Sequence, residues 1–272
     1  MKDKKSKETS LTKFDGFIFD LDGVIYRGNQ PIEGARTCIN LLHKSDKQYA
    51  FVTNHTKYTQ KEIGARLRDM DIRVRDNQII TANNAAIDYM REQMAEEEIK
   101  VNLLGSGGIR EDFENAGFAF TADRPDFVVI AWDPEFTYET MYRAVRNVQE
   151  GANFIVTSPD RLIPSSEREF ELGFGALGAL IQYATQKEPV YVGKPYPPML
   201  NAACQIMDTK IKDTVVVGDT PETDLRSRTL AGLGASVLVL SGNTSREDIA
   251  SIPENARPTF ILDSIREFDK YF

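Results

Sequence analysis

Two pairs of carboxylates stand at the ends of apolar runs that are typical of buried β-strands. Asp20 ends the run FDGFIFD and Asp22 follows it two residues later, and Asp219 and Asp224 follow the run TVVV. Residues two apart lie on the same side of an extended strand, so Asp20 and Asp22 project together. Crowded carboxylates repel one another unless a cation is bound or their pKa values rise. Because all these donors are oxygens, the sequence predicts Mg²⁺ as the cation.

Two further strand ends carry groups that can bind a phosphoryl group. The run YAFVT ends at Thr53 and is followed by Asn54, and Lys194 follows the run VYVG. In parallel sheets, ligands bind at the edge formed by the carboxyl ends of the strands. At that edge, one aspartate can attack phosphorus to form a covalent intermediate. A second aspartate can exchange a proton with the leaving oxygen and then with water.

The elements that must position these residues alternate regularly along the chain. Apolar strand-like runs are separated by segments with helical spacing of apolar residues. This alternation predicts right-handed βαβ units and therefore an α/β fold with a doubly wound, Rossmann-like parallel sheet. The predicted helices include 33–44, 59–70, 83–97, 138–149, 173–184, 198–207 and 223–233, and the predicted strands include 49–53, 100–104, 127–131, 154–157, 190–192, 214–217, 236–240 and 259–262.

The combined motifs resemble those of a known enzyme family. Asp20-x-Asp22-Gly-Val, Thr53-Asn54, Gly-Lys194-Pro and Gly-Asp219-x-x-x-x-Asp224 are similar to the motifs of the haloacid dehalogenase (HAD) superfamily of phosphatases. The wider pattern of DLDGVIYRG, IEGA, FVTN, VGKP, GDTPETD and VLVLSG resembles the NagD-like subfamily. That subfamily includes p-nitrophenyl phosphatases and sugar-phosphate phosphatases, so the resemblance implies a HAD core with an inserted α/β cap.

The resemblance also implies roles for the four aspartates. Asp20 is similar to the nucleophile that forms a phospho-aspartyl intermediate. Asp22 is similar to the general acid/base, with its backbone carbonyl as a ligand of Mg²⁺. Asp219 resembles a further protein ligand of the metal, and Asp224 would support the metal site directly or through water. These assignments are expectations carried over from the family.

The phosphate-binding and cap residues match the family less completely. Thr53, Asn54 and Lys194 would hold the phosphoryl oxygens, but His55 stands where the family often has a second Asn. Two interpretations of His55 remain open. It either caps or lines the following loop, or it contacts substrate and gives activity a pH dependence near neutrality. The segment TSPD resembles a cap segment T-N-x-D, so Asp160 either selects substrate or stabilises a turn.

The resemblance, together with the spacing of the motifs, implies the domain organisation. The segment between Thr53 and Lys194 has the size of an inserted cap domain. The resemblance therefore implies a HAD hydrolase core at 13–82 and 189–272 and the cap at 83–188. The polar and charged start of the chain, MKDKKSKETS, is expected to belong to a disordered tail at 1–12. Two cysteines, Cys38 and Cys204, stand in apolar stretches and are expected to be buried free thiols.

The residues and the resemblance together predict a Mg²⁺-dependent phosphomonoester hydrolase that acts on a small phosphorylated metabolite. The resemblance implies sugar phosphates as the leading substrate class and p-nitrophenyl phosphate as an artificial substrate. A phosphotransferase or mutase on the same scaffold, and a non-catalytic phosphometabolite sensor, are the alternatives. The formal net charge of −8 disfavours nucleic acid as a partner. The absence of a long apolar run argues against a membrane span, and the sparse cysteines favour the cytoplasm. The resemblance allows a cap-mediated homodimer.

Overall fold

The computed structural model describes residues 10–94, 98–164 and 170–272, and the chain forms two compact units. The first unit comprises Met1–Thr53, Gln60–Ile80 and Pro195–Phe272, and the second comprises Asn54–Thr59 and Thr81–Lys194. The boundaries expected from the sequence, 82/83 and 188/189, do not assign the short segment 54–59 to the second unit. The assignment of these units as catalytic core and cap stays a prediction.

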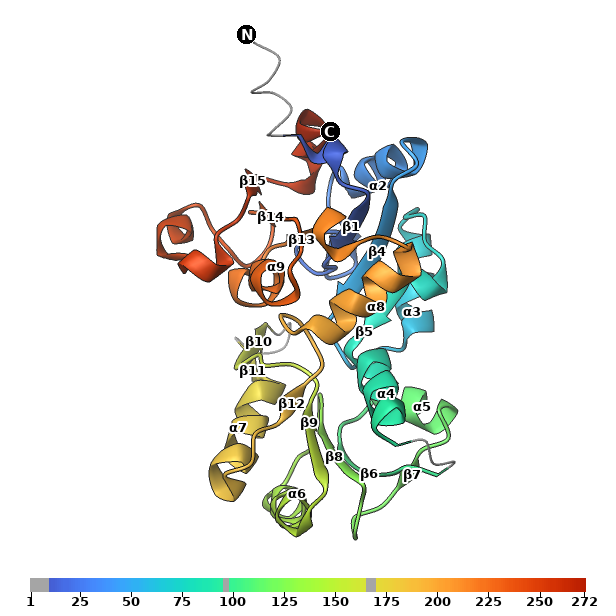
Figure 1. The fold of residues 1–272 in the computed structure, drawn as a ribbon, viewed down its shortest axis with the longest axis vertical. Coiled ribbons are helices and arrows are strands. Elements are labelled where there is room, and N and C mark those ends of the chain that lie inside the picture. Colours follow the sequence, from blue (N-terminus) through green and yellow to red (C-terminus); the bar gives the residue numbers. More distant parts are fainter. Residues whose placement is uncertain (1–9, 95–97, 165–169) are drawn as a thin grey trace. The chain divides into compact units, whose positions relative to one another are not determined.

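The described part of the first unit contains a six-stranded sheet in the order β15-β14-β13-β1-β4-β5 (Figure 1). The pairings of β1 with β13 and β4, of β13 with β14, and of β14 with β15 are all parallel. The chain runs from β1 to β4 and β5 on one side and later returns to β13 on the other, so the topological switch point lies between β1 and β13. The strands are β1 (Gly16–Phe19), β4 (Gln48–Thr53), β5 (Ile79–Thr81), β13 (Thr214–Gly218), β14 (Ala235–Val239) and β15 (Phe260–Leu262).

Both faces of this sheet are covered, which explains why its central strands are continuously apolar. Every residue of β1 and of β13 is buried, as expected for parallel strands between two helical layers. Phe17 and Phe19 project to one face, where their rings lie 5.6 and 6.2 Å from the ring of Phe268. The helix α8 contacts β1 and β4. The helices are α2 (Ala35–Lys44), α3 (Gln60–Asp69), α8 (Pro197–Met207) and α9 (Arg226–Ala231), with shorter helical turns η1 (Leu11–Lys13), η2 (Asp76–Gln78), η3 (Ile211–Asp213), η4 (Pro221–Leu225), η5 (Glu247–Ser251), η6 (Glu254–Ala256) and η7 (Ile265–Tyr271).

The described part of the second unit contains a five-stranded parallel sheet in the order β12-β9-β8-β6-β7. The helices α6 and α7 pack against this sheet and against each other, over a core that includes Val128, Val156 and Ile181. The elements are β6 (Lys100–Leu104), β7 (Ala119–Phe120), β8 (Phe127–Ile130), β9 (Asn153–Val156), β12 (Val190–Tyr191), α4 (Ala82–Gln93), α5 (Gly108–Asn115), α6 (Tyr138–Glu150) and α7 (Phe174–Thr185). The parallel α/β fold predicted from the alternation of elements is therefore confirmed.

The structure differs from the sequence-based expectations mainly at short elements. The antiparallel pairs β2 (Tyr26–Arg27) with β3 (Gln30–Pro31) and β10 (Leu162–Pro164) with β11 (Phe170–Leu172) were not predicted. Strands of two or three residues are too short to show a clear period of two. The predicted helix 223–233 is instead a π-helical turn, η4, followed by α9.

Two predicted segments have different bounds in the structure. Of the expected tail 1–12, residues 1–9 lie outside the described residues, whereas Leu11 is fully buried in η1. The predicted helix 83–97 ends at Gln93, and residues 95–97 lie outside the described residues.

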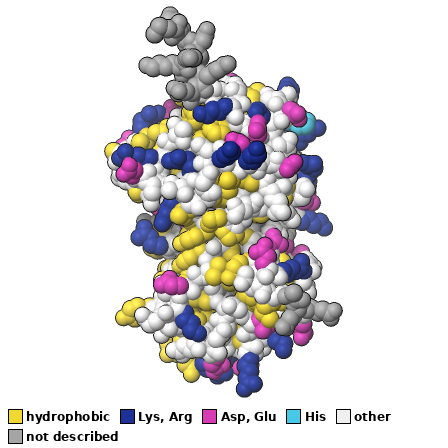
Figure 2. All heavy atoms as spheres, in the orientation of Figure 1, with side chains coloured by type: hydrophobic (Ala, Val, Ile, Leu, Met, Phe, Trp, Pro, Cys, Tyr) yellow, Lys and Arg dark blue, Asp and Glu magenta, His cyan; other side chains and the backbone are white. Residues whose placement is uncertain are grey.

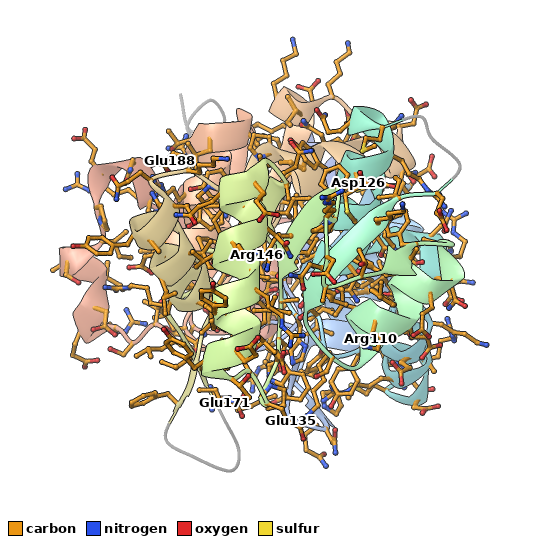
Figure 3. The ribbon with its side chains drawn as sticks, turned by 90° about the horizontal axis from the view of Figure 1, so that it is seen from below. Arg110, Asp126, Glu135, Arg146, Glu171 and Glu188 are labelled. Atoms are coloured by element: carbon orange, nitrogen blue, oxygen red, sulfur yellow. The ribbon has the colours of Figure 1, made fainter. Side chains whose placement is uncertain are left out.

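The described surface carries charges of both signs. On the face shown in Figure 2, Lys and Arg side chains are interspersed with Asp and Glu side chains. Arg146 on α6, which is labelled in Figure 3, contacts Glu150 at 3.1 Å and Asp123 at 3.8 Å. The side chains of Arg146 and Glu150 are about half exposed, and that of Asp123 is largely exposed. Within residues 10–94, 98–164 and 170–272, no helix has the length and apolar character needed to span a membrane.

Candidate active site

The switch point of the first unit positions two of the predicted aspartates. Asp20 follows β1 and Asp219 follows β13, and these two strands are parallel neighbours in register. The N–H of Asp20 donates to the carbonyl of Val217 at 2.9 Å, which continues the pairing past the end of β1. The two carboxylates therefore emerge at the same edge of the sheet, as the sequence predicted from the strand ends.

A third carboxylate joins them. Ligand oxygens of Asp20, Asp219 and Asp224 all lie within 4.8 Å of one another. Asp20 is partly exposed, whereas Asp219 is 2% and Asp224 0% exposed. Three hard oxygen donors this close, two of them buried, form a cluster whose mutual repulsion a divalent cation would neutralise. The donor set thus fits Mg²⁺, and Asp20 alone offers an open side toward solvent.

Asp219 is held by hydrogen bonds at each of its oxygens. Its Oδ2 accepts from the N–H of Asn243 at 2.7 Å, and its Oδ1 accepts from the hydroxyl of Thr220 at 2.9 Å. Its backbone carbonyl accepts from the hydroxyl of Thr244 at 2.5 Å. Sequence reasoning missed Asn243 and Thr244. Their only signal was their position just after β14, the strand next to β13, within the motif VLVLSGNT.

Asp224 holds the backbone of the same loop. Its Oδ2 accepts from the N–H groups of Asp219 and Thr220, both at 3.1 Å. Gly218 permits this arrangement, because a side chain at that position would overlap with Asp224. Asp224 therefore acts on the loop that carries Asp219, in addition to adding charge to the cluster.

The loop after β14 also contacts the turn after β1. The hydroxyl of Ser241 donates to the carbonyl of Gly23 at 2.7 Å, and the guanidinium of Arg27 donates to the carbonyl of Ser241. Gly23 adopts a φ of +77°, in the left-handed region that glycine tolerates best. A Cβ at Gly23 would overlap with the carboxylate of Asp219. The turn after β1, which carries Asp20 and Asp22, and the loop after β13, which carries Asp219 and Asp224, are thus packed closely together. We call these two segments the acidic loops.

Asp22 stands apart from the three-carboxylate group. Its side chain is exposed. Its backbone forms an isolated β-bridge with that of Tyr26, where the chain turns into the hairpin β2–β3. We expected Asp22 to bind the metal through its backbone carbonyl. The group formed by Asp20, Asp219 and Asp224 consists of side-chain oxygens, so it does not test that expectation. Exposure leaves the carboxylate open to proton exchange.

The second unit brings together three of the other predicted residues, Asn54, Asp160 and Lys194. Asn54 accepts from the N–H of Lys194 at 2.7 Å and donates to the carbonyl of Lys194 at 3.0 Å. The same amide group donates to the hydroxyl of Ser158 at 3.2 Å and lies 3.4 Å from Oδ2 of Asp160. The Ser158 hydroxyl also donates to Asp160. Lys194 is 2% exposed.

Thr53 and His55 flank Asn54 in sequence. Thr53 is the last residue of β4 in the first unit and is buried. Nδ1 of His55 accepts from the N–H of Lys57 at 3.1 Å, and its ring stacks on Tyr58 at 5.3 Å. Of the two interpretations of His55, these contacts match a residue that caps the loop following it.

The fold and the carboxylate cluster define a class of protein. A doubly wound α/β unit with acidic side chains at its switch point, interrupted by a second α/β unit, is the architecture of hydrolases that act on phosphate esters or related groups. Profiles of sequence families agree with this class. Residues 17–119 match haloacid dehalogenase-like hydrolases, and residues 191–268 match HAD-hydrolase-like proteins.

Similar proteins whose activities are named place the chain in a narrower group within this class. The chain is 32% identical to the 5'-nucleotidase YutF of Bacillus subtilis (strain 168) over 261 residues, which covers 96% of this chain and 100% of the relative. It is 31% identical to an acid sugar phosphatase of Staphylococcus aureus (strain MRSA252), covering 94% and 97% of the two chains. The chain belongs to the haloacid dehalogenase superfamily, in its NagD-like group, and it is a phosphatase.

Solved structures of similar proteins have the same fold. A 4-nitrophenylphosphatase from Thermotoga maritima has a TM-score of 0.87 at 28% identity, covering 96% of this chain and 98% of the other. A glycerol phosphate phosphatase from Mycobacterium tuberculosis in complex with magnesium has a TM-score of 0.83 at 26% identity, covering 95% and 78%. These likenesses extend over both units of the chain.

Proposed function

We propose that this phosphatase is a Mg²⁺-dependent phosphomonoester hydrolase that acts through a phospho-aspartyl intermediate on Asp20. The observation that carries this proposal is the group formed by Asp20, Asp219 and Asp224, whose ligand oxygens lie within 4.8 Å of one another. A mere structural role would not explain why Asp20, at the end of a central strand, keeps an open side beside two buried carboxylates.

The residues that would hold Mg²⁺ are Asp20, Asp219 and the backbone carbonyl of Asp22, with Asp224 in support. When bound, the ion neutralises negative charge on the carboxylates and on the phosphoryl group, so that an anionic nucleophile can approach phosphorus. The magnesium complex of the glycerol phosphate phosphatase from M. tuberculosis supports this choice of metal.

The first chemical step belongs to Asp20. One oxygen of its carboxylate forms a bond to phosphorus as the bond from phosphorus to the leaving alcohol oxygen breaks. Asp22, whose carboxyl is exposed, donates its proton to that leaving oxygen. The products of this step are the free alcohol and a phospho-aspartate on Asp20. Covalent catalysis of this kind divides a difficult displacement into two easier steps.

The second step restores the enzyme. Water attacks phosphorus of the phospho-aspartate, and Asp22, now ionised, accepts a proton from that water. The bond between phosphorus and Asp20 breaks, which releases inorganic phosphate and regenerates Asp20 as a carboxylate and Asp22 as the protonated acid. Lys194 and Thr53 would bind the phosphoryl oxygens during both steps. The ammonium group of Lys194 would offset the negative charge of the transferring group.

The substrate class that we favour is a sugar phosphate. The name of the acid sugar phosphatase from S. aureus supports it, and the glycerol phosphate phosphatase supports small polyol phosphates. The 5'-nucleotidase of B. subtilis supports nucleoside monophosphates as the competing class. The 4-nitrophenylphosphatase of T. maritima supports p-nitrophenyl phosphate as a convenient artificial substrate.

The test is phosphate release from a panel of p-nitrophenyl phosphate, sugar phosphates, glycerol phosphate and nucleoside monophosphates. Each substrate is assayed with Mg²⁺, with a chelator, and with the variant Asp20→Asn. We expect release that requires Mg²⁺, is abolished by Asp20→Asn and is fastest with a sugar phosphate. Full activity of Asp20→Asn would refute the mechanism, and a nucleotide preference would refute the substrate class.

A further inference from the structure

The peptide groups of Lys194 have an unusual hydrogen-bond partner. Lys194 is 2% exposed, lies beyond the end of β12 at Tyr191 and precedes Pro195. Buried N–H and C=O groups are almost always paired, usually with another backbone segment. Here the single carboxamide of Asn54 pairs with both, at 2.7 Å to the N–H and 3.0 Å to the carbonyl. The carboxamide of Asn54 thus satisfies the N–H and the carbonyl of Lys194, as the backbone of a neighbouring strand does inside a sheet.

The orientation of the Asn54 amide is fixed by the segment that follows β9. Nδ2 of Asn54 donates to the Ser158 hydroxyl at 3.2 Å and lies 3.4 Å from the carboxylate of Asp160. The Ser158 hydroxyl also accepts from the N–H of Asp160 at 3.2 Å. A reversed amide would point its NH₂ group at the N–H of Lys194 and its oxygen at the Asp160 carboxylate, so both contacts would become repulsive.

The residue before Lys194 is packed against the same two segments. A Cβ at Gly193 would overlap with the carbonyl of Thr157 and would lie 2.7 Å from Oδ1 of Asn54. Gly193 therefore allows the chain to approach both neighbours closely. Together, the segment 157–160, Asn54 and Lys194 form one connected group within the second unit.

We propose that Asn54 is a positioning residue for Lys194, and that Ser158 and Asp160 fix Asn54 in the orientation this requires. This inference rests on the proposed function, in which Lys194 binds the phosphoryl oxygens. In this inference the side chain of Asn54 binds the backbone of Lys194. Only the backbone N–H of Asn54 then remains to bind phosphate. The inference also links phosphate binding to the segment 157–160, which sequence reasoning associated with substrate choice or with a turn.

The chemistry of the contact explains why an amide is needed. The two peptide groups of Lys194 require one acceptor and one donor a short distance apart, and a carboxamide offers both without charge. A carboxylate would supply no donor to the carbonyl of Lys194 and would face Asp160 with a like charge. A displacement of about 1 Å at a phosphate-binding group is enough to cost about 100-fold in rate.

The test is a double-mutant cycle with Asn54→Ala and Lys194→Ala. The readouts are kcat and KM for p-nitrophenyl phosphate and the affinity for inorganic phosphate in the presence of Mg²⁺, measured by calorimetry. We expect Asn54→Ala to lower kcat/KM and phosphate affinity by about 10- to 100-fold. In the Lys194→Ala background, Asn54→Ala should change either quantity by less than about twofold, because Asn54 acts through Lys194.

The matched control is Asn201→Ala, which makes the same change at an exposed position of α8. It should leave both readouts at the wild-type values. If Asn54→Ala does not fold, Ser158→Ala replaces it in the cycle, since it leaves both contacts to Lys194 but frees the amide to turn. That variant should give a smaller loss in the same direction, again absent in the Lys194→Ala background.

Two results would overturn the inference while the proposed function stands. One is an active wild-type enzyme whose kinetics and phosphate affinity are unchanged by Asn54→Ala. The other is a pair of losses that multiply in the double variant, since this would mean that Asn54 acts independently of Lys194. A wild-type protein that neither hydrolyses any ester nor binds phosphate would overturn both proposals together.

Discussion

The carboxylate of Asp224 accepts a hydrogen bond from the backbone N–H of Asp219 at 3.1 Å, and both side chains belong to the same three-carboxylate group. One acidic residue therefore shapes the loop that presents the other. The N–H of Thr220 donates to the same oxygen of Asp224, also at 3.1 Å. Asp224 is fully buried, so these bonds and the proposed cation compensate a charge that would otherwise be costly to bury.

The variant Asp224→Asn tests this supporting role. It can retain an acceptor for the two N–H groups but removes a buried negative charge beside Asp219. We expect the affinity for Mg²⁺, measured by titration calorimetry on the metal-free protein, to fall by about 10- to 100-fold. Glu222→Gln is the control, because it makes the same change of charge on the exposed side of the same turn. Equal losses in the two variants would mean that only net charge matters.

The positions of Asp20 and Asp219 could be predicted because each stands at the end of a long apolar run. Runs such as GFIF and TVVV are buried on both faces, and parallel strands bring the residues after them to one edge of the sheet. Asn243 and Thr244 could not be predicted from the same logic. They act through a backbone N–H and through a hydroxyl bond to a carbonyl, and neither contact requires a distinctive residue type.

The contacts of Asn54 show a second limit of sequence reasoning. The motif Thr53-Asn54 predicted phosphate binding by residue type, but the side-chain bonds of Asn54 go to Lys194, 140 residues further along the chain. Such a pairing depends on how the fold brings the last residue of the second unit, Lys194, back to its first residue, Asn54. Periodicity and strand ends do not contain that information. The antiparallel pair β10 and β11 was missed for a different reason, because its three-residue strands are too short for a period to be read.

The two cysteines allow a prediction about reactivity. Burial raises the pKa of the Cys38 thiol well above its usual range, with a smaller contribution from the charge of Asp269. Burial also raises the pKa of Cys204, and hydrogen bonding to Thr214 and Thr209 offsets part of this effect. Because the thiolate is the reactive form, both thiols should be alkylated at least about tenfold more slowly in the native protein than in denaturant at pH 8. Mass spectrometry after iodoacetamide treatment measures this.

The same shifts predict a direction for stability against pH. Native thiols stay protonated at pH values where unfolded thiols ionise, near pH 8.5 and above. The unfolded state then binds fewer protons than the native state, so the free energy of unfolding should fall as the pH rises through this range. Cys38→Ala should remove part of that fall relative to wild type. An unchanged slope in this variant, or fast native alkylation of both thiols, would contradict the assignment.

Thr244 provides a test of the loop that holds Asp219. Thr244→Val removes the hydroxyl that donates to the carbonyl of Asp219 and leaves that buried acceptor without this bond. We expect the free energy of unfolding to fall by about 1–3 kcal/mol and the affinity for Mg²⁺ to fall with it. The matched variant is Thr229→Val, which removes an exposed hydroxyl bond to the carbonyl of Asn255 and should cost about 0.5 kcal/mol or less. A loss of stability in Thr244→Val with unchanged metal affinity would separate this bond from the metal site.

The close packing of the two acidic loops makes Gly23 sensitive to substitution. Gly23 and Gly28 both have positive φ angles, +77° and +55°, so alanine at either position costs about 1 kcal/mol in backbone strain. Around Gly28 no atom lies within 4 Å of the added Cβ, whereas at Gly23 the Cβ would overlap with the Asp219 carboxylate and lie 2.8 Å from Cα of Gly242. Gly23→Ala should therefore displace Asp219 as well as strain the backbone.

The comparison of these two variants isolates the effect of packing on the metal site. We expect Gly28→Ala to lower thermal stability slightly while it retains wild-type affinity for Mg²⁺ and wild-type hydrolysis of p-nitrophenyl phosphate. Gly23→Ala should lose more stability and should weaken Mg²⁺ binding by at least about tenfold, because Asp219 can no longer occupy the same position. Since the backbone strain is common to both, equal metal affinities would show that Asp219 does not depend on the contact with Gly23.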